Sequence, residues 1–348
     1  MTASSSGRAR ASGKRPKATD VAAAAGVSIA TVSLVINGKA AGRVSPATQA
    51  RVEKAIADLG YVVDSAARSL VTGRRQCVAL VAPDVGNPFF SQVAAGVATA
   101  LGTEYRLLLA VSGAEHDQPD LDQLVAFGVD GILLEFPGAE PPSGQIGCPV
   151  VLLDEPSGPP ELSRVYFDTR AATREMVDQL VELGHRNIVY LDASREGKTF
   201  ETRRRQVANR LRRTPGTALT RVRSDIKVDD ASTLVAESLP DWRRAGVTAI
   251  ISATDVLGYG ALSALGAAGV SVPKQMSLVS FDDLPFSKLT SPALTTVRLS
   301  AYDLGYASAR ILREQLAEES PAPRQESLPA MLINRSSVGP ARRLRARG

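Results

Sequence analysis

The stretch Thr19-Asp-Val-Ala-Ala-Ala-Ala-Gly-Val-Ser-Ile-Ala-Thr-Val-Ser-Leu-Val-Ile-Asn37 decides the fold of the first part of this chain. Apolar residues recur at helical spacing on both sides of Gly26, so the pattern predicts two short helices joined by a tight turn. Gly26 suits the turn because glycine adopts backbone angles that a side chain forbids, and Ser28 is a natural N-cap. Two helices joined in this way are typical of a helix-turn-helix, whose second helix lies in the major groove of DNA. The predicted inner faces comprise Val21, Ala22 and Ala25 in the first helix and Val32, Val35 and Ile36 in the second.

A third helix is predicted over residues 46–59, with Ser45 as its N-cap and Pro46 at its first position. It would close a small three-helix core. The tail that precedes these helices is rich in Ser, Gly and basic residues, which favours disorder. The predicted division of the chain is a basic tail (1–16), a helix-turn-helix domain (17–62), a hinge (63–76), an effector-binding and dimerisation domain (77–340) and a second basic tail (341–348).

Charge is distributed unevenly along the chain. The 348 residues carry a formal net charge of +5, but residues 1–76 contain 12 Lys and Arg against 4 Asp and Glu, whereas the remainder contains 29 against 32. A basic segment attracts the phosphates of nucleic acid, and an acidic one does not. The asymmetry therefore favours a DNA-binding module joined to a ligand-binding body.

Several features predict a cytoplasmic location, at the nucleoid. No apolar run is long enough to span a membrane, and the basic N-terminus lacks the apolar segment of a secretory signal. The two cysteines, Cys77 and Cys148, offer neither a disulfide framework nor the spacing of metal ligands, so we expect them to be packing residues. No constellation of metal-binding residues is recognisable, and we expect no metal and no cofactor.

From Cys77 onward, apolar runs of strand length alternate with helical patterns. This alternation is typical of doubly wound α/β proteins with parallel sheets, whose buried strands are apolar on both faces. The predicted strands lie at residues 78–81, 107–111, 132–134, 150–153, 188–191, 249–251 and 277–280, and the predicted helices at residues 92–101, 172–183, 258–268 and 302–316.

The segment from Asp20 to Asn37 matches the pattern D-V-A-x-x-A-G-V-S-x-x-T-V-S-x-x-x-N. Further matching segments are Leu59-Gly-Tyr61, Ala66-Ala-Arg-Ser-Leu70, Val81-Ala-Pro-Asp84, Asn87-Pro-Phe-Phe90, Leu183-Gly-His185, Ser280-Phe-Asp-Asp283 and Leu332-Ile-Asn-Arg-Ser336. In these segments the chain resembles the lactose-repressor/galactose-repressor (LacI/GalR) family of bacterial transcription regulators. The resemblance covers nearly the whole chain apart from the two tails. It implies a periplasmic-binding-protein-like body of two doubly wound parallel-sheet subdomains, between which the chain crosses near residues 184, 299 and 327.

The resemblance also implies which residues contact DNA. Ile29, Ala30 and Leu34 stand where the family reads bases, and Leu34 replaces a common Arg. Apolar side chains contact thymine methyl groups but make no bidentate hydrogen bonds, so we expect less direct readout from these three residues. In the hinge, Leu70 would wedge into the minor groove. The predicted DNA-binding residues are Ser28, Ile29, Ala30, Thr31, Ser33, Leu34 and Asn37 in the head and Ala67 and Leu70 in the hinge.

A ligand of a doubly wound sheet lies beyond the carboxyl ends of the strands, so residues directly after the apolar runs are candidates for effector binding. By the resemblance, Arg203 donates hydrogen bonds to hydroxyls or a carboxylate, and Asp282 accepts them from sugar hydroxyls. The predicted effector-binding residues are Asp84, Asn87, Phe89, Phe90, Asp168, Arg203, Asp255 and Asp282. A sugar or sugar derivative is the expected effector, with a nucleoside or a phosphorylated metabolite as the alternative.

The function implied is that of a ligand-responsive, sequence-specific transcriptional regulator, expected to be a repressor. One helix-turn-helix reads a half-site, so a pseudo-palindromic operator requires a homodimer. We expect residues 92–101 to contribute to the dimer surface. Effector binding would change the angle between the subdomains and thereby the order of the hinges, an allosteric mechanism. Whether the effector releases or promotes DNA binding stays open.

Two other functions fit only parts of the sequence. The segment Gly258-Tyr-Gly-Ala-Leu-Ser263 resembles a dinucleotide fingerprint, but Ser263 occupies the third glycine position. Neither His116 nor His185 has the partners of a catalytic triad. A secreted sugar-binding protein would fit residues 77–340 and leave the basic head without a role. We therefore predict a regulator and not an enzyme.

Overall fold

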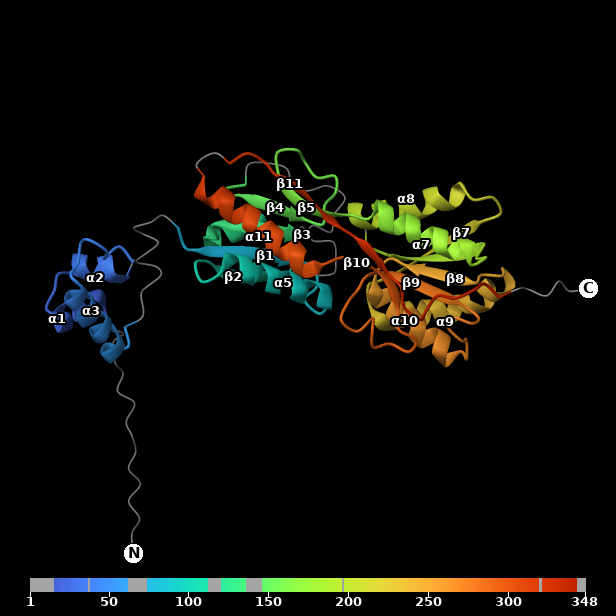
Figure 1. The fold of residues 1–348 in the computed structure, drawn as a ribbon, viewed down its shortest axis with the longest axis horizontal. Helices are drawn as coiled ribbons and strands as arrows, with labels where there is room; N and C mark the ends of the chain where they lie inside the picture. Colours follow the sequence, from blue (N-terminus) through green and yellow to red (C-terminus); the bar gives the residue numbers. More distant parts are fainter. Residues whose placement is uncertain are drawn as a thin grey trace, which may run out of the picture. The chain divides into compact units, whose positions relative to one another are not determined.

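The structure is a computed structural model of the chain, and it describes residues 16–36, 38–61, 74–111, 120–135, 146–195, 197–318 and 321–342. The chain forms two compact units, Met1–Arg75 and Gln76–Gly348, which we call the head and the body. The division lies at the end of the predicted hinge, one residue before the predicted start of the effector-binding domain. Figure 1 shows the head as helices alone and the body as helices and sheets.

Among its described residues, the head contains three helices, α1 (Ala18–Ala25), α2 (Ile29–Ile36) and α3 (Pro46–Leu59). α1 ends at Gly26, whose φ of 63° lies in the left-handed region that favours glycine. Ser45 caps α3 by accepting a hydrogen bond from the backbone N–H three residues on. The buried core of the head consists of Val21, Ala22, Ala25, Val32, Val52 and Ala55. The predicted helix-turn-helix, with its third helix, is confirmed.

The part of the body that the structure describes contains two six-stranded sheets. Sheet A has the strand order β11-β5-β4-β3-β1-β2, and sheet B the order β12-β10-β9-β8-β6-β7. Neighbouring strands are parallel except β10 and β12, which are antiparallel. Sheet A comprises β1 (Cys77–Ala82), β2 (Arg106–Val111), β3 (Gly131–Glu135), β4 (Val150–Leu153), β5 (Ser163–Asp168) and β11 (Gln325–Pro329). Sheet B comprises β6 (Asn187–Ala193), β7 (Ala218–Ser224), β8 (Ala249–Ser252), β9 (Ser277–Asp282), β10 (Thr295–Arg298) and β12 (Met331–Ile333).

Helices separate the strands, as the sequence predicts for a doubly wound fold. They are α5 (Pro88–Leu101), α6 (Leu121–Phe127), α7 (Arg170–Glu182), α8 (Lys198–Arg212), α9 (Val228–Arg244), α10 (Asp255–Ala267) and α11 (Ala301–Ala317). Each predicted strand and helix is present. β7 escaped prediction because it is an edge strand whose side chains are mostly exposed, so it lacks an apolar run. β5, whose buried and half-buried residues alternate, and the short β10, β11 and β12 are also absent from the predicted set.

The chain crosses between the two subdomains three times, and the crossings lie side by side. β5 ends in sheet A, and α7 packs on α8 and β12, so the first crossing is at Thr169. The crossing predicted near residue 184 was therefore wrong, because the chain crosses before α7 and not after it. The second crossing lies at Leu299, where the sequence places one, and the third is at Ala330, close to the predicted residue 327. The strand register pairs Pro329 with Asp168, and Arg298 with Met331, which makes the three crossings neighbours.

After the second crossing, α11 packs along α5 against sheet A (Figure 1). Two glycines allow the helix backbones to touch. A Cβ atom on Gly96 would lie 2.0 Å from the carbonyl oxygen of Tyr302, and one on Gly305 would lie 2.1 Å from that of Val93. The close contact anchors α11 firmly in the first subdomain.

Within the part of the chain that the structure describes, no single helix is long and apolar enough to cross a membrane. Only α1 and α2 taken together have the length and apolar composition of a membrane span, and the pair is bent by 104° at its junction.

Candidate DNA-binding surface and effector site

The second helix of the head presents its predicted DNA-binding residues to solvent. Ile29 is 52% exposed, and Ala30 and Ser33 are also exposed, whereas Val32 faces the core. Leu34 is half-buried, so only its outer part is available for contact. An exposed face that begins at the N-terminus of α2 is the arrangement with which a recognition helix enters the major groove.

Ser28 and Thr31 fix the start of this helix. The Ser28 Oγ accepts a hydrogen bond from the Thr31 backbone N–H at 3.1 Å and lies 2.9 Å from the Thr31 hydroxyl. The capping role predicted for Ser28 is confirmed. Asn37, Ala67 and Leu70, which the sequence also predicts to contact DNA, lie outside the residues that the structure describes.

A cavity of about 380 Å³ lies between the two subdomains of the body. Its walls come from segments that follow the carboxyl ends of β1, β3 and β4 in the first subdomain and of β6, β7, β8 and β9 in the second. The lining residues are Pro83, Asp84, Asn87, Phe89, Phe90, Glu135, Asp154, Ser194, Arg195, Thr199, Phe200, Arg203, Asp225, Ile226, Lys227, Thr254 and Asp282. This is the edge at which doubly wound sheets bind ligands.

Six of the eight predicted effector-binding residues line this cavity. They are Asp84, Asn87, Phe89, Phe90, Arg203 and Asp282. Asn87 caps α5 through a hydrogen bond from the Phe89 N–H at 3.0 Å, and the two phenylalanine rings pack edge to face. The β1–α5 loop therefore brings an aromatic pair and polar groups together, as the sequence predicts.

The other two predicted residues do not line the cavity. Asp168 forms a surface ion pair with Arg170 at 2.7 Å, which lowers the pKa of its carboxyl. Asp255 is fully buried and accepts hydrogen bonds from the Leu284 N–H and the Thr296 hydroxyl at 2.8 Å each, and from Ser287. These contacts hold the loop after β9, so Asp255 positions the neighbouring Asp282.

Arg203 joins the two subdomains across the cavity. Its Nη2 lies 3.2 Å from Asp154 Oδ2 in the first subdomain, and its Nη1 lies 3.2 Å from Asp282 Oδ1 in the second. The guanidinium also stacks between the rings of Phe200 and Phe281, with centroid distances of 5.7 and 5.4 Å. Only 4% of Arg203 is exposed, and its Nε has no hydrogen-bond partner among the described residues.

The two carboxyl groups beside Arg203 are electrostatically unusual. Burial raises the pKa of Asp282 to about 8 and that of Asp154 to about 6, although the attraction of Arg203 acts in the opposite direction on both. One guanidinium cannot fully compensate two buried carboxylates, so the pair retains a proton more readily than free aspartates do. Both residues also have positive φ, 52° for Asp154 and 115° for Asp282. Backbone strain of this kind gathers where structure serves a site.

Two further contacts cross the cavity beside Arg203. The Arg195 Nη2 lies 2.8 Å from Glu135 Oε2, with both side chains about four-fifths buried. The Thr199 hydroxyl donates a hydrogen bond to the backbone carbonyl of Asp154. All three contacts run from α8 and the segment before it to the ends of β3 and β4. This set of contacts, which we call the clasp, comprises Arg195, Thr199 and Arg203 together with Glu135 and Asp154.

Sequence reasoning missed most of the other residues that line the cavity. Glu135 and Asp154 directly follow predicted strands, so the rule that selected Asp84 would have found them. Asp225, Ile226 and Lys227 follow β7, which the sequence does not reveal as a strand. Ser194, Arg195 and Thr254 also follow strand ends.

A helix-turn-helix head and a two-subdomain body with a ligand-sized cavity define a DNA-binding protein with a ligand-binding domain. Residues 18–64 match the family model of bacterial regulatory proteins of the lacI family, and residues 177–338 match that of the periplasmic binding protein-like domain. The chain belongs to the lacI family of bacterial regulatory proteins. The LacI/GalR resemblance and the predicted fold class are thus confirmed.

Relatives of the chain are transcriptional regulators rather than enzymes. The HTH-type transcriptional regulator CelR of Thermobifida fusca is 33% identical over 341 residues, which cover 93% of this chain and 98% of that protein. A solved CelR–cellobiose complex matches with a TM-score of 0.65 and 28% identity, over 93% of this chain and all of that one. The lac repressor dimer bound to operator and an anti-inducer shares the fold, with a TM-score of 0.80 and 23% identity over 94% of this chain and all of that one.

Proposed function

We propose that this regulator is a homodimeric repressor that binds a pseudo-palindromic operator and is controlled by a sugar-like effector in the cavity of the body. Its place of action is the cytoplasm, at the nucleoid. The observation that carries the proposal is the contact of Arg203 with both Asp154 and Asp282, because it puts the ligand-binding groups and the contact between subdomains in the same place.

The chemistry of the cavity supports a sugar. Carboxylates and an amide, such as Asp84, Asp225 and Asn87, accept hydrogen bonds from hydroxyl groups, and the Phe89–Phe90 pair offers an apolar surface to a ring. The cellobiose in the CelR complex is a precedent within the family. A sugar that competes for Arg203 and Asp154 would replace contacts between the subdomains with contacts to itself.

This competition links the cavity to DNA. The body begins at Gln76, directly before β1 of the first subdomain, and residues 63–76 join it to the head. A change in the angle between subdomains in a dimer would shift the two hinge attachments relative to each other. The effector thereby shifts the equilibrium between hinge states that do and do not fit the operator.

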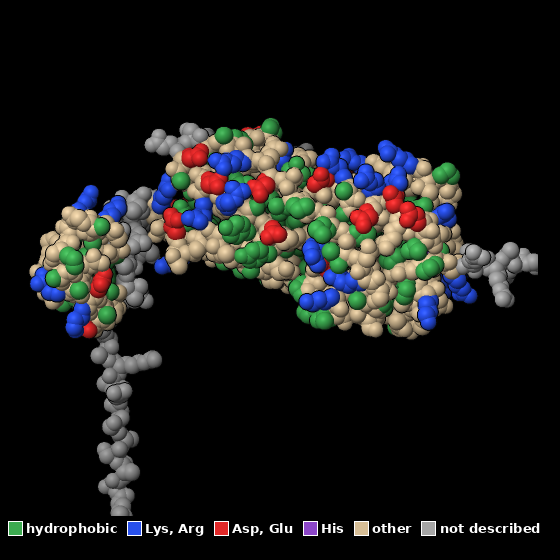
Figure 2. All heavy atoms as spheres, viewed as in Figure 1, with side chains coloured by type: hydrophobic (Ala, Val, Ile, Leu, Met, Phe, Trp, Pro, Cys, Tyr) green, Lys and Arg blue, Asp and Glu red, His purple; other side chains and the backbone are tan. Residues whose placement is uncertain are grey.

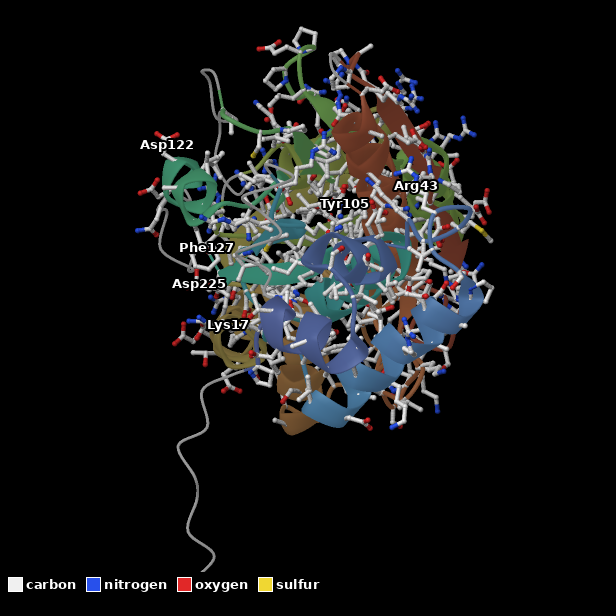
Figure 3. The ribbon with its side chains drawn as sticks, turned by 90° about the vertical axis from the view of Figure 1, so that its left-hand side faces the viewer. Lys17, Arg43, Tyr105, Asp122, Phe127 and Asp225 are labelled. Atoms are coloured by element: carbon white, nitrogen blue, oxygen red, sulfur yellow. The ribbon has the colours of Figure 1, made fainter. Side chains whose placement is uncertain are left out.

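The first subdomain has a surface that suits a second copy of the chain. The edge strand β2 exposes about half of Leu109 and of Val111, and Phe127 at the end of α6 is 61% exposed. Figure 3 shows Asp122 and Phe127 carried by this short peripheral helix. The exposed residues of α5 include Ala95 and Ala98, whose small side chains allow close packing. This surface includes the predicted segment 92–101.

The test is to incubate the purified chain with fragmented DNA from its source and to sequence the retained fragments, with and without candidate sugars. We expect one enriched palindrome, whose retention changes with one class of sugar. Asp282→Ala should retain the same palindrome and lose the response, whereas the exposed Asp241→Ala should keep both. An unchanged response of Asp282→Ala would remove the cavity from the mechanism, and enrichment of a single half-site would exclude the homodimer.

A further inference from the structure

A second hollow, of about 240 Å³, adjoins the effector cavity and shares Ser194, Arg195 and Phe200 with it. Its lining contains five cationic side chains and one carboxylate. These are Arg195, Lys198, Arg204, Arg221 and Arg223, with Glu201 as the carboxylate. We call this hollow the basic pocket. Figure 2 shows Lys and Arg side chains gathered along this edge of the body, over α7 and α8.

The strand register explains why the arginines converge. β6 and β7 are parallel, and Asp192 pairs with Arg223 while Tyr190 pairs with Arg221. Paired residues point to the same face of a sheet, and residues two apart share that face. Arg221, Arg223 and Asp192 therefore share one face of sheet B, and α8, which packs on β6 and β7, brings Arg204 to Asp192.

A buried carboxylate holds two of these guanidinium groups in place. Asp192 is completely buried, and its Oδ2 lies 2.8 Å from Arg204 Nη1 and 2.7 Å from Arg221 Nη2. Each arginine uses only part of its five N–H donors in this contact. The remaining donors belong to fixed, partly exposed groups that line the pocket. Arginines oriented in this way are suited to bind phosphate or carboxylate groups in a bidentate manner.

The pocket retains positive charge after its internal pairs are counted. Arg195 is compensated by Glu135, Lys198 by Glu201 at 3.0 Å, and Arg204 and Arg221 share the single charge of Asp192. Arg223 forms no ion pair with any residue that the structure describes. The 15-residue helix α8 also begins here, and no side chain caps its first N–H groups. Its dipole adds to the preference for an anion.

The effector cavity has the opposite charge balance. Five carboxyl groups line it (Asp84, Glu135, Asp154, Asp225 and Asp282), against the three cations Arg195, Arg203 and Lys227, so the cavity stays net negative even where the Asp154–Asp282 pair retains one proton. An acidic compartment that accepts hydroxyl donors therefore adjoins a basic one that attracts anions. We propose that the basic pocket binds the phosphate or carboxylate group of an acidic sugar, whose hydroxylated ring lies in the effector cavity. This inference rests on the proposed function, since it names the class of effector.

The first experiment measures binding of inorganic phosphate to the full chain by calorimetry. Replacing Arg204 or Arg221 would remove one of the two partners of the buried Asp192, so the test variant is Lys198→Gln combined with Arg223→Gln, both at exposed or half-exposed positions. Loss of charge-assisted hydrogen bonds should weaken phosphate binding about tenfold or more. Arg243→Gln, an exposed change of equal charge on α9, should have no effect. No phosphate binding to the unmodified chain, or equal binding by the double variant, would overturn the proposal.

The second experiment compares glucose, glucose 6-phosphate and glucuronate. We expect one acidic sugar to bind at least about tenfold more tightly than glucose, and the double variant to lose that preference. The two acidic probes distinguish a phosphate from a carboxylate. Glucose that binds as tightly as both acidic sugars would overturn this inference and leave the proposed function intact. If phosphate binds and none of the three sugars does, the result would instead contradict a sugar effector and support only the anion-binding role of the basic pocket.

Discussion

The head and the body present their functional side chains in opposite ways. α2 holds Ile29 and Ser33 outward, above a core of six small or medium-sized residues. The body buries Arg203 and Asp282 to 4% and 6% exposure, between two subdomains. A single continuous segment forms the surface of the head, whereas the ends of seven strands form the cavity. The head therefore depends on a small apolar core to present its predicted DNA-binding surface. The body depends on buried charged side chains to hold its effector site.

The largest expected effect comes from a substitution that unfolds the head and leaves the body folded. Val32 is completely buried, so Val32→Asp places an unpaired carboxylate in the core of the head. The cost, about 3–5 kcal/mol, is comparable with the whole stability expected of a domain of this size. We expect operator binding to be lost and effector binding to remain, because head and body are separate compact units.

The measurements are operator retention and calorimetric titration of an effector on the same preparation. Ala24→Asp introduces the same charge at an exposed position of α1 and serves as the control. Retention of operator by Val32→Asp would show that the head tolerates disruption of its core, and the contrast with the body would fail.

A smaller effect should come from the buried charges of the body. Asp282 has a pKa of about 8 in the folded state and about 3.9 when unfolded. The folded state therefore binds the proton more tightly, and this stabilisation is complete below about pH 4 and lost as the pH rises through about 8. The free energy of unfolding should therefore fall steadily between about pH 4 and pH 8.

Urea unfolding of the body at several pH values would measure this slope. Asp282→Asn has the same shape and does not titrate, so its profile should be flatter than that of the unmodified chain. The exposed Asp241→Asn should leave the slope unchanged. Parallel profiles for all three proteins would contradict the assignment of the buried proton to Asp282.

The smallest expected effect concerns a helix cap of the head. Ser45→Ala removes the hydrogen bond that the Ser45 hydroxyl accepts from the Thr48 N–H at 3.2 Å, at a cost of about 1 kcal/mol. Operator affinity should fall slightly and the melting temperature of the head by a few degrees. Ser45→Asp, which also caps, should restore both; if it behaves like Ser45→Ala, the cap does not contribute.

The same contrast explains how far each region could be predicted from sequence. Gly26, Ser28 and the apolar residues of the head act within a few residues of each other, so their spacing predicts the helices and the exposed face. The parallel strands of the body are also legible, because burial on both faces makes them continuously apolar. β7 carries Arg221 and Arg223 at the edge of its sheet and lacks that signal.

The cavity was harder to predict because it joins residues that are distant in the sequence. Asp282 and Arg203 follow from the family resemblance, but their partner Asp154 lies in the other subdomain. Asp255 resembles an effector ligand in sequence, since it follows a strand end as Asp84 does. Only the structure shows that the Asp255 carboxylate already accepts hydrogen bonds from Thr296, Ser287 and the Leu284 N–H.

The three adjacent crossings at Thr169, Leu299 and Ala330 have a consequence for how this body can be divided. Because β11 completes sheet A and β12, one residue later, completes sheet B, a stop codon just before Gln325 would deprive both sheets of an edge strand at once. No single cut in the gene yields either subdomain as one uninterrupted piece. The two halves are therefore translated and inherited together.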